Sequence, residues 1–141
     1  MRTTGDRIRH AISFEIIGLI LIMPLGGWAF EMPMHDIGVV GLVSSLLAAA
    51  WTYTYNLLFD HAMLKICGSV RKTFAVRLVH TLLYEAGLLL ILVPFIAWYL
   101  AVTLMYAFLM DVAFAVFYML YAFSFNWAYD RLFPIPVARG Q

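Results

Sequence analysis

The chain has few charged residues and a single cysteine. Only 12% of its 141 residues are Asp, Glu, Lys or Arg, and 65% are hydrophobic, whereas soluble domains carry roughly 25% charged residues. Nine Lys and Arg against eight Asp and Glu leave a formal charge of +1, which excludes the basic footprint of a nucleic-acid-binding protein and a disordered polyelectrolyte. One cysteine, Cys67, excludes an intramolecular disulfide framework and a cysteine-based zinc site. A small polytopic membrane protein remains.

Two long stretches contain no Lys or Arg, from Arg9 to Lys65 and from Arg77 to Arg131. Each is far longer than the ~20 residues that one membrane-spanning helix needs, so each predicts two helices joined by a turn. We expect helices over about residues 8–30, 37–59, 78–99 and 104–129, with turns at 31–36 and near 101–103. These runs are apolar on every face, whereas a barrel needs short alternating segments. The predicted fold is an all-α integral membrane protein with four transmembrane helices.

The basic residues indicate one fixed orientation. They gather at the N-terminus, in the middle loop and at the C-terminus, as Arg2, Arg7, Arg9; Lys65, Arg71, Lys72, Arg77; and Arg131, Arg139. An even number of crossings puts these three regions on one side, and the positive-inside rule places that side in the cytoplasm. We therefore expect a multi-pass protein of the bacterial inner membrane with both termini cytoplasmic.

An internal repeat has a constant offset of seventy residues and no gaps. The scarce polar residues match better than the apolar ones do, and the matched pairs are Arg7/Arg77, His10/His80, Glu15/Glu85, Asn56/Asn126 and Asp60/Asp130. The repeat predicts two tandem helical hairpins, residues 1–70 and 71–141, that run parallel and are related by an axis along the membrane normal.

Antiparallel packing inside each hairpin predicts which polar residues meet. The start of the first helix lies beside the end of the second, which brings together Arg7 and His10 with Asp60 and Asn56, and Arg77 and His80 with Asp130 and Asn126. Polar groups near hydrocarbon are costly unless they have partners. We interpret these two sets as helix clamps, with a cytoplasmic gate or proton-entry role as the alternative.

Three acidic residues fall inside the apolar stretches. Glu15 lies eight residues beyond Arg7, which is ~12 Å and close to the midplane of a ~30 Å hydrocarbon layer. Glu85 has the same depth by the same count. A carboxylate there is expensive and indicates a function, or else a protonated group that hydrogen-bonds a neighbouring helix. Asp111 precedes Asp130 by ~28 Å of helix, so we expect it at the opposite interface, as a solvated helix-end residue or one that attracts cations.

The last predicted helix is rich in aromatic residues, namely Phe108, Phe114, Phe117, Tyr118, Tyr121, Phe125 and Trp127. Such residues usually pack or contact lipid, but aromatic faces also attract organic cations. The candidate substrate-binding residues are Glu85, Tyr84, Phe117, Tyr118 and Tyr121. No pair of histidines has metal-ligand spacing and no nucleophile–base pair is evident, so we expect neither a metal, nor a cofactor, nor an enzyme.

Four motifs in order resemble the proteobacterial antimicrobial compound efflux (PACE) family. They are RIRHAISFE, WTYTYNLLFD, RLVHTLLYE and YAFSFNWAYDRLFP, which extend from Arg7 to Pro134. The chain looks like two tandem bacterial transmembrane pair domains. The resemblance implies an inner-membrane exporter that uses the proton gradient to expel cationic biocides and dyes such as chlorhexidine, acriflavine and quaternary ammonium compounds. Short diamines are the natural substrates proposed for the family. The glutamate to which the family assigns proton and substrate coupling aligns with Glu15.

The residues agree with what this resemblance implies. An ionised midplane carboxylate can hold a cation among aromatic rings, and protonation removes the charge that held it. Four helices enclose little of a path for an amphipathic molecule, so we expect a homodimer. The expected partners are protons, small cationic amphipathic substrates and the lipid bilayer. The alternatives are a non-transporting interaction subunit, whose intramembrane acids pair with partner helices, and a small four-helix multidrug transporter with a single glutamate.

Overall fold

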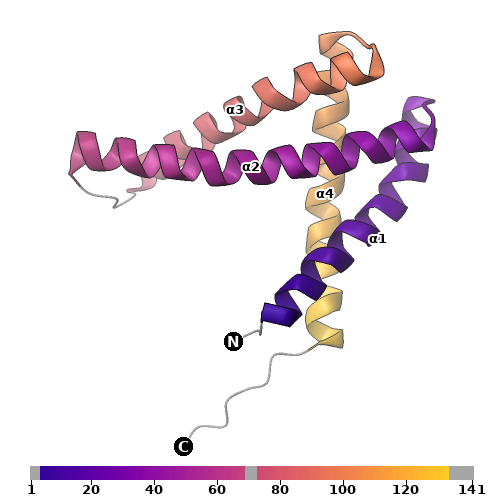
Figure 1. The fold of residues 1–141 in the computed structure, drawn as a ribbon, viewed down its shortest axis with the longest axis horizontal. Helices are drawn as coiled ribbons and strands as arrows, with labels where there is room; N and C mark the ends of the chain where they lie inside the picture. Colours follow the sequence, from indigo (N-terminus) through magenta and orange to yellow (C-terminus); the bar gives the residue numbers. More distant parts are fainter. Residues whose placement is uncertain (1–3, 69–72, 134–141) are drawn as a thin grey trace, which may run out of the picture. The chain divides into compact units, whose positions relative to one another are not determined.

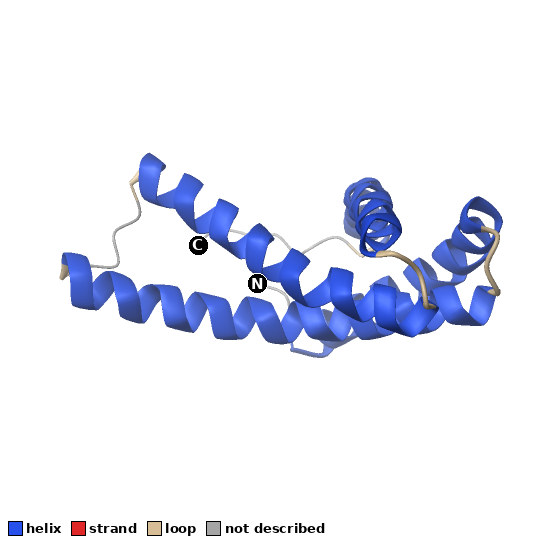
Figure 2. Ribbon diagram, turned by 90° about the horizontal axis from the view of Figure 1, so that it is seen from above, coloured by secondary structure: helices blue, strands red, loops and turns tan. Residues whose placement is uncertain are grey.

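The computed structural model describes residues 4–68 and 73–133, which form four helices and, over those ranges, no strand (Figures 1 and 2). The helices are α1 (Thr4–Phe30), α2 (Met34–Cys67), α3 (Phe74–Leu100) and α4 (Leu104–Leu132). All four are long and apolar enough to cross a membrane. The predicted all-helical membrane fold is therefore confirmed.

Helix α2 is longer than the sequence pattern predicted. It has 34 residues and continues to Cys67, so it spans ~51 Å where a hydrocarbon layer needs only ~30 Å. Its last turns contain no helix-breaking residue, and the helix ends at Gly68, which has φ +65° and donates its N–H to the carbonyl of Leu64 at 3.1 Å. A glycine in the left-handed conformation is a common helix terminator. The predicted end near residue 59 was wrong because Gly68 was not used as the stop signal.

The two short turns have the same geometry, seventy residues apart. Glu31 and Ala101 both have a left-handed backbone, with φ of 53° and 52°. In each turn the next residue donates its N–H to a carbonyl five residues back, at 3.1 Å in both cases. The second turn lies at 101–103, as expected, although it contains neither Gly nor Pro. Its following helix begins where the Thr103 side chain accepts the N–H of Tyr106 at 3.2 Å, a typical helix N-cap.

The chain divides into two compact units that do not coincide with the two sequence repeats. Unit 1 comprises Met1–Gly41 and Val112–Gln141, and unit 2 is Leu42–Asp111. Unit 1 thus contains α1, the first turns of α2 and most of α4. Unit 2 contains the rest of α2, all of α3 and the first turns of α4.

Each unit buries a small apolar core. In unit 1 the core includes Ile22, Ile37, Val40, Phe114, Tyr121 and Tyr129, and in unit 2 it includes Tyr55, Met63, Leu92, Ile96, Ala107 and Met110. Gly26 lets α1 approach α2 closely, since a Cβ there would lie 2.7 Å from Ile37 Cγ2. Apart from the core tyrosines, no polar or charged side chain is buried among the described residues. Large apolar side chains remain exposed, Trp28 and Trp98 among them, as expected of helices that contact lipid.

Candidate functional site

A histidine–asparagine pair joins α1 to α4 in unit 1. His10 Nε2 lies 2.8 Å from Asn126 Oδ1, and an amide oxygen can only accept, so the imidazole N–H donates. The imidazole makes edge contacts with Phe125 and Tyr129, at centroid distances of 5.2 and 4.6 Å. The polar pair is therefore enclosed on one side by aromatic rings.

Unit 2 contains the same arrangement between α3 and α2. His80 Nε2 lies 3.2 Å from Asn56 Oδ1, and the imidazole contacts Tyr55 and Phe59 at 4.9 and 4.6 Å. Every one of these residues is the repeat mate of its counterpart in unit 1. The Tyr55 hydroxyl adds a 2.7 Å hydrogen bond to the His80 carbonyl.

These contacts overturn the partners expected for the two histidines. The hairpin model placed His10 beside Asn56 and His80 beside Asn126, whereas the hydrogen bonds join His10 to Asn126 and His80 to Asn56. The first helix of each repeat therefore pairs with the second helix of the other repeat. Both asparagines have the same sequence environment, so the repeat alone did not distinguish the two pairings.

Three of the four arginines and aspartates of the expected clamps are less enclosed than the half-buried histidines. Arg7, Arg77 and Asp130 are exposed and Asp60 is half-buried, with its Oδ1 atom buried. Arg7 and Asp60 belong to different units, as do Arg77 and Asp130. Their pairing stays a prediction.

The backbone just before Glu15 and just before Glu85 is held by an aromatic donor. In unit 1 the Tyr121 hydroxyl donates to the Phe14 carbonyl at 2.7 Å. In unit 2 its repeat mate, Trp51, donates its indole N–H to the Tyr84 carbonyl at 3.1 Å. Phe14 and Tyr84 immediately precede Glu15 and Glu85, so the same contact fixes the helix at both acids.

A glycine beyond each glutamate makes room for the aromatic donor. A Cβ on Gly18 would lie 3.1 Å from the Tyr121 ring, and a Cβ on Gly87 would overlap the Trp51 indole. Neither glycine has a left-handed backbone. Their role is therefore close approach between helices rather than backbone freedom.

Glu15 lies near the middle of α1, about 16 Å along the helix from Thr4 and about 22 Å from Phe30. The side chain is half-buried, and its Oε1 atom is buried. Its charge acts on the hydroxyls of Tyr118 and Tyr121 of α4. The acid predicted to lie deep in the membrane thus faces the aromatic helix, on the side where candidate substrate-binding residues lie.

The aromatic residues opposite Glu15 form a stacked group on α4. Phe117 stacks on Tyr121 with a centroid distance of 5.8 Å and an interplanar angle of 7°, and it meets Tyr118 edge-on at 5.2 Å. The Tyr118 hydroxyl is buried and has no hydrogen-bond partner among the described residues. It lies over Gly41, where a Cβ would be 3.7 Å away. A buried hydroxyl of this kind can accept a hydrogen bond from an ammonium group.

Glu85, the repeat mate of Glu15, lies in a different environment. Its side chain is exposed and its charge acts on Asp111 of α4, which is half-buried. The neighbouring Tyr84 hydroxyl is 2.9 Å from Thr52 Oγ1. Asp111 is seven residues inside α4, about 10 Å from its first residue. Asp111 is thus not an end residue of α4, although the helix begins at Leu104 as expected; its position at the opposite interface stays a prediction.

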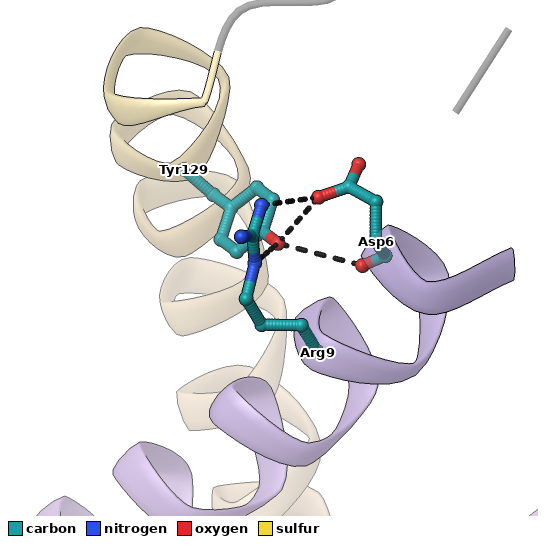
Figure 3. A network of polar contacts seen from close by, with 3 residues as sticks. All are labelled: Asp6, Arg9 and Tyr129. Carbon is teal, nitrogen blue, oxygen red and sulfur yellow. Dashed lines mark hydrogen bonds and ion pairs between the residues drawn. The ribbon is translucent and has the colours of Figure 1, made fainter. Parts of the chain in front are cut away.

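A polar network near the N-terminus of α1 was missed by the sequence analysis. Arg9 Nε donates to the Tyr129 hydroxyl at 3.0 Å, and the same hydroxyl donates to Asp6 Oδ1 at 3.0 Å (Figure 3). Arg9 and Asp6 also form an ion pair at 2.5 Å, and the guanidinium lies 3.9 Å from the centroid of Phe133. The i,i+3 spacing of Asp6 and Arg9 was the available signal. The arginine in this network is Arg9, whereas the repeat pattern pointed to Arg7.

Comparison with known proteins decides the family. The family model described as chlorhexidine efflux transporter matches the chain twice, over residues 2–65 and 72–135. The chain belongs to the chlorhexidine efflux transporter family. Two matches in tandem confirm the repeat and the resemblance to the PACE family.

Curated relatives of this transporter carry the name "Short-chain diamines transporter". One from Vibrio parahaemolyticus is 40% identical over 134 residues, which are 94% of this chain and 93% of the relative. One from Acinetobacter baumannii is 32% identical over 132 residues, with 94% and 90% covered. No solved structure matches the chain. The family and the relatives establish a multi-pass membrane transporter rather than an enzyme, and they support this reading over an interaction subunit.

Proposed function

We propose that this transporter exports organic cations from the bacterial cytoplasm in exchange for protons, with Glu15 as the group that binds both. The supporting observation is the position of Glu15. Its half-buried carboxyl group lies at mid-helix and faces the hydroxyls of Tyr118 and Tyr121. The family description names chlorhexidine and the relatives' names specify short-chain diamines, and both are cationic molecules.

The exchange follows from the chemistry of one carboxyl group beside aromatic rings. In its ionised form Glu15 holds a positive charge, while the π faces of Phe117 and Tyr121 contact the body of the cation. A proton that binds Glu15 removes the negative charge, and the cation then leaves. Protons and cations compete for one carboxylate, so a lower pH weakens cation binding. The proton gradient thereby drives export.

The two histidine–asparagine pairs suit the cytoplasmic ends of this pathway. His10 and His80 lie near the N-terminal ends of α1 and α3, where the basic residues of these helices are found. Each precedes the glutamate of its helix by five residues. With both termini cytoplasmic, His10 and His80 would lie between the cytoplasm and the two acids, where a proton must enter or leave. We propose that these pairs both clamp the helices and gate that route.

The small size of the protein supports an oligomer. Four helices provide little surface to enclose an amphipathic substrate, so we propose a parallel homodimer in the inner membrane. The many exposed apolar side chains of the single chain are compatible with contacts to lipid or to a second copy.

Transport by Glu15→Gln protein tests the proposal. Purified protein in liposomes should move chlorhexidine against its gradient when a pH gradient is imposed, and Glu15→Gln protein should not, since an amide exchanges no proton. Glu31→Gln is the matched control, because it removes an exposed acid from the turn after α1 and should transport normally. Proton-driven export by folded Glu15→Gln protein would sink the coupling role of Glu15.

A further inference from the structure

An apolar groove lies between α3 and α4 in unit 2. Its volume is about 490 Å³, and it is lined by Ala86, Leu89, Val93 and Pro94 of α3 together with Leu104 and Phe108 of α4. Ligand pockets are typically of this size and are mainly apolar. None of the residues that line the groove takes part in the proposed exchange at Glu15.

Two carboxyl groups flank one end of this groove. Glu85 immediately precedes the lining residue Ala86 and lies one turn before Leu89. Asp111 lies one helical turn after the lining residue Phe108. The charge of Glu85 acts on Asp111. An apolar body in the groove would therefore meet concentrated negative charge at this end.

The repeat shows how this acidic end differs from its counterpart in unit 1. The repeat mate of Asp111 is Gly41, which packs against Leu19 and Ile22 of α1 and lies beneath the Tyr118 hydroxyl. The repeat mate of Tyr118 is Ala48. Near Glu15, the second polar group is thus the Tyr118 phenol, whereas near Glu85 it is the Asp111 carboxylate. The two equivalent sites have different chemistry.

We propose that the groove between α3 and α4 is a second binding site, which takes an organic cation with a bulky apolar body. The apolar part fills the space between Ala86 and Phe108, and the positive charge lies between Glu85 and Asp111. Two neighbouring carboxylates repel each other in a medium of low dielectric constant, and a bound cation relieves that repulsion. Charge complementarity therefore selects a cation over a neutral lipid chain. This inference rests on the proposed export of cations but concerns residues separate from Glu15.

Binding of radiolabelled tetraphenylphosphonium tests the site. The protein is held in nanodiscs of phosphatidylcholine, with empty nanodiscs as background, and all variants carry Glu15→Gln so that binding at Glu15 is removed. Adding Asp111→Asn should weaken binding by about tenfold or more. Adding Asp111→Glu in its place keeps the charge and should leave binding as it is in the Glu15→Gln parent. Adding Ala86→Phe, which fills the groove and leaves both acids, should weaken binding to a similar extent. Glu31→Gln should have no effect.

The outcomes separate this site from the exchange at Glu15. If Asp111→Asn or Ala86→Phe protein bound the probe within about twofold of its parent, the site would be refuted. If only Ala86→Phe weakened binding of the probe, the groove would bind it without the acids. If only Asp111→Asn weakened binding, the acids would act without the groove. Either result overturns the proposal. Probe binding that is unchanged by both groove substitutions, together with proton-driven export that is lost in Glu15→Gln protein, would preserve the proposed function and remove only the second site.

Discussion

The hydroxyl of Tyr121 donates a 2.7 Å hydrogen bond to the carbonyl oxygen of Phe14, the residue before Glu15. Trp51 makes the equivalent contact with Tyr84, the residue before Glu85. Two different donors at repeat-related positions, a phenol and an indole, thus bind the carbonyl of the residue before a glutamate. Each ties the backbone beside an intramembrane acid to a helix of the other repeat.

Tyr121→Phe should loosen the helix at Glu15. The substitution retains the ring that stacks on Phe117 and removes only the hydroxyl, so the expected loss of stability is about 0.5–1.5 kcal/mol, as for other hydrogen bonds between membrane helices. Transport should fall more than stability does, because Glu15 is less well positioned. Thermal melting in detergent and transport in liposomes measure the two effects. Full activity in Tyr121→Phe protein would show that the carbonyl contact does not position Glu15.

A double-mutant cycle tests the exchange of helices between the repeats. His10→Ala and Asn126→Ala should show a coupling energy of about 0.5–1.5 kcal/mol, since they remove the two partners of one hydrogen bond. His10→Ala and Asn56→Ala should be additive. Coupling in the second cycle and none in the first would restore pairing within each hairpin.

Gly87→Ala should destabilise the protein by about 1–3 kcal/mol, because the added methyl group overlaps the Trp51 indole. Gly5→Ala provides the control, since nothing lies within 4 Å of the new Cβ. Alanine is the better helix former by up to ~1 kcal/mol, so Gly5→Ala should be neutral or stabilising. Equal melting temperatures for the two variants would argue against close packing at Gly87.

Tyr129→Phe should destabilise unit 1 by about 1 kcal/mol, because it removes the hydroxyl that connects Arg9 to Asp6. The ring contact with His10 remains in this variant. The measurement is thermal melting, and Tyr53→Phe is a control at an exposed tyrosine. If Tyr129→Phe left the melting temperature unchanged while Asp6→Asn lowered it, only the local Asp6–Arg9 pair would contribute to stability.

Cysteine labelling in intact cells should determine the orientation of the chain. The native Cys67 is exposed at the end of α2 and should be protected from an impermeant maleimide added outside, because the positive-inside rule places it in the cytoplasm. A Cys67→Ala, Pro33→Cys variant should label readily, since residue 33 lies in the turn at the other end of α2. Strong labelling of Cys67 from outside would reverse the proposed topology.

The sequence by itself determined four membrane-spanning helices, the repeat and the place of Glu15 near the middle of α1. Long stretches without Lys or Arg required two crossings each, and the spacing from Arg7 set the position of Glu15 along α1 by helical rise alone. The turn at 101–103 followed from the repeat, although it has no Gly or Pro. These features depend on local chain geometry and on the length of apolar helix that a membrane requires. Both can be read from the sequence.

Only the tertiary structure decided which helices pair. His10 can donate to Asn56 or to Asn126, and the two asparagines are followed four residues later by Asp60 and Asp130, so their chemistry is the same. A repeat makes the two partners equivalent in sequence, and the choice then depends on packing over the whole helix. That packing includes the space that Gly18 leaves for Tyr121 and that Gly87 leaves for Trp51. The electrostatic interaction of Asp111 with Glu85 likewise depends on which face α4 turns toward α3, which the sequence does not specify.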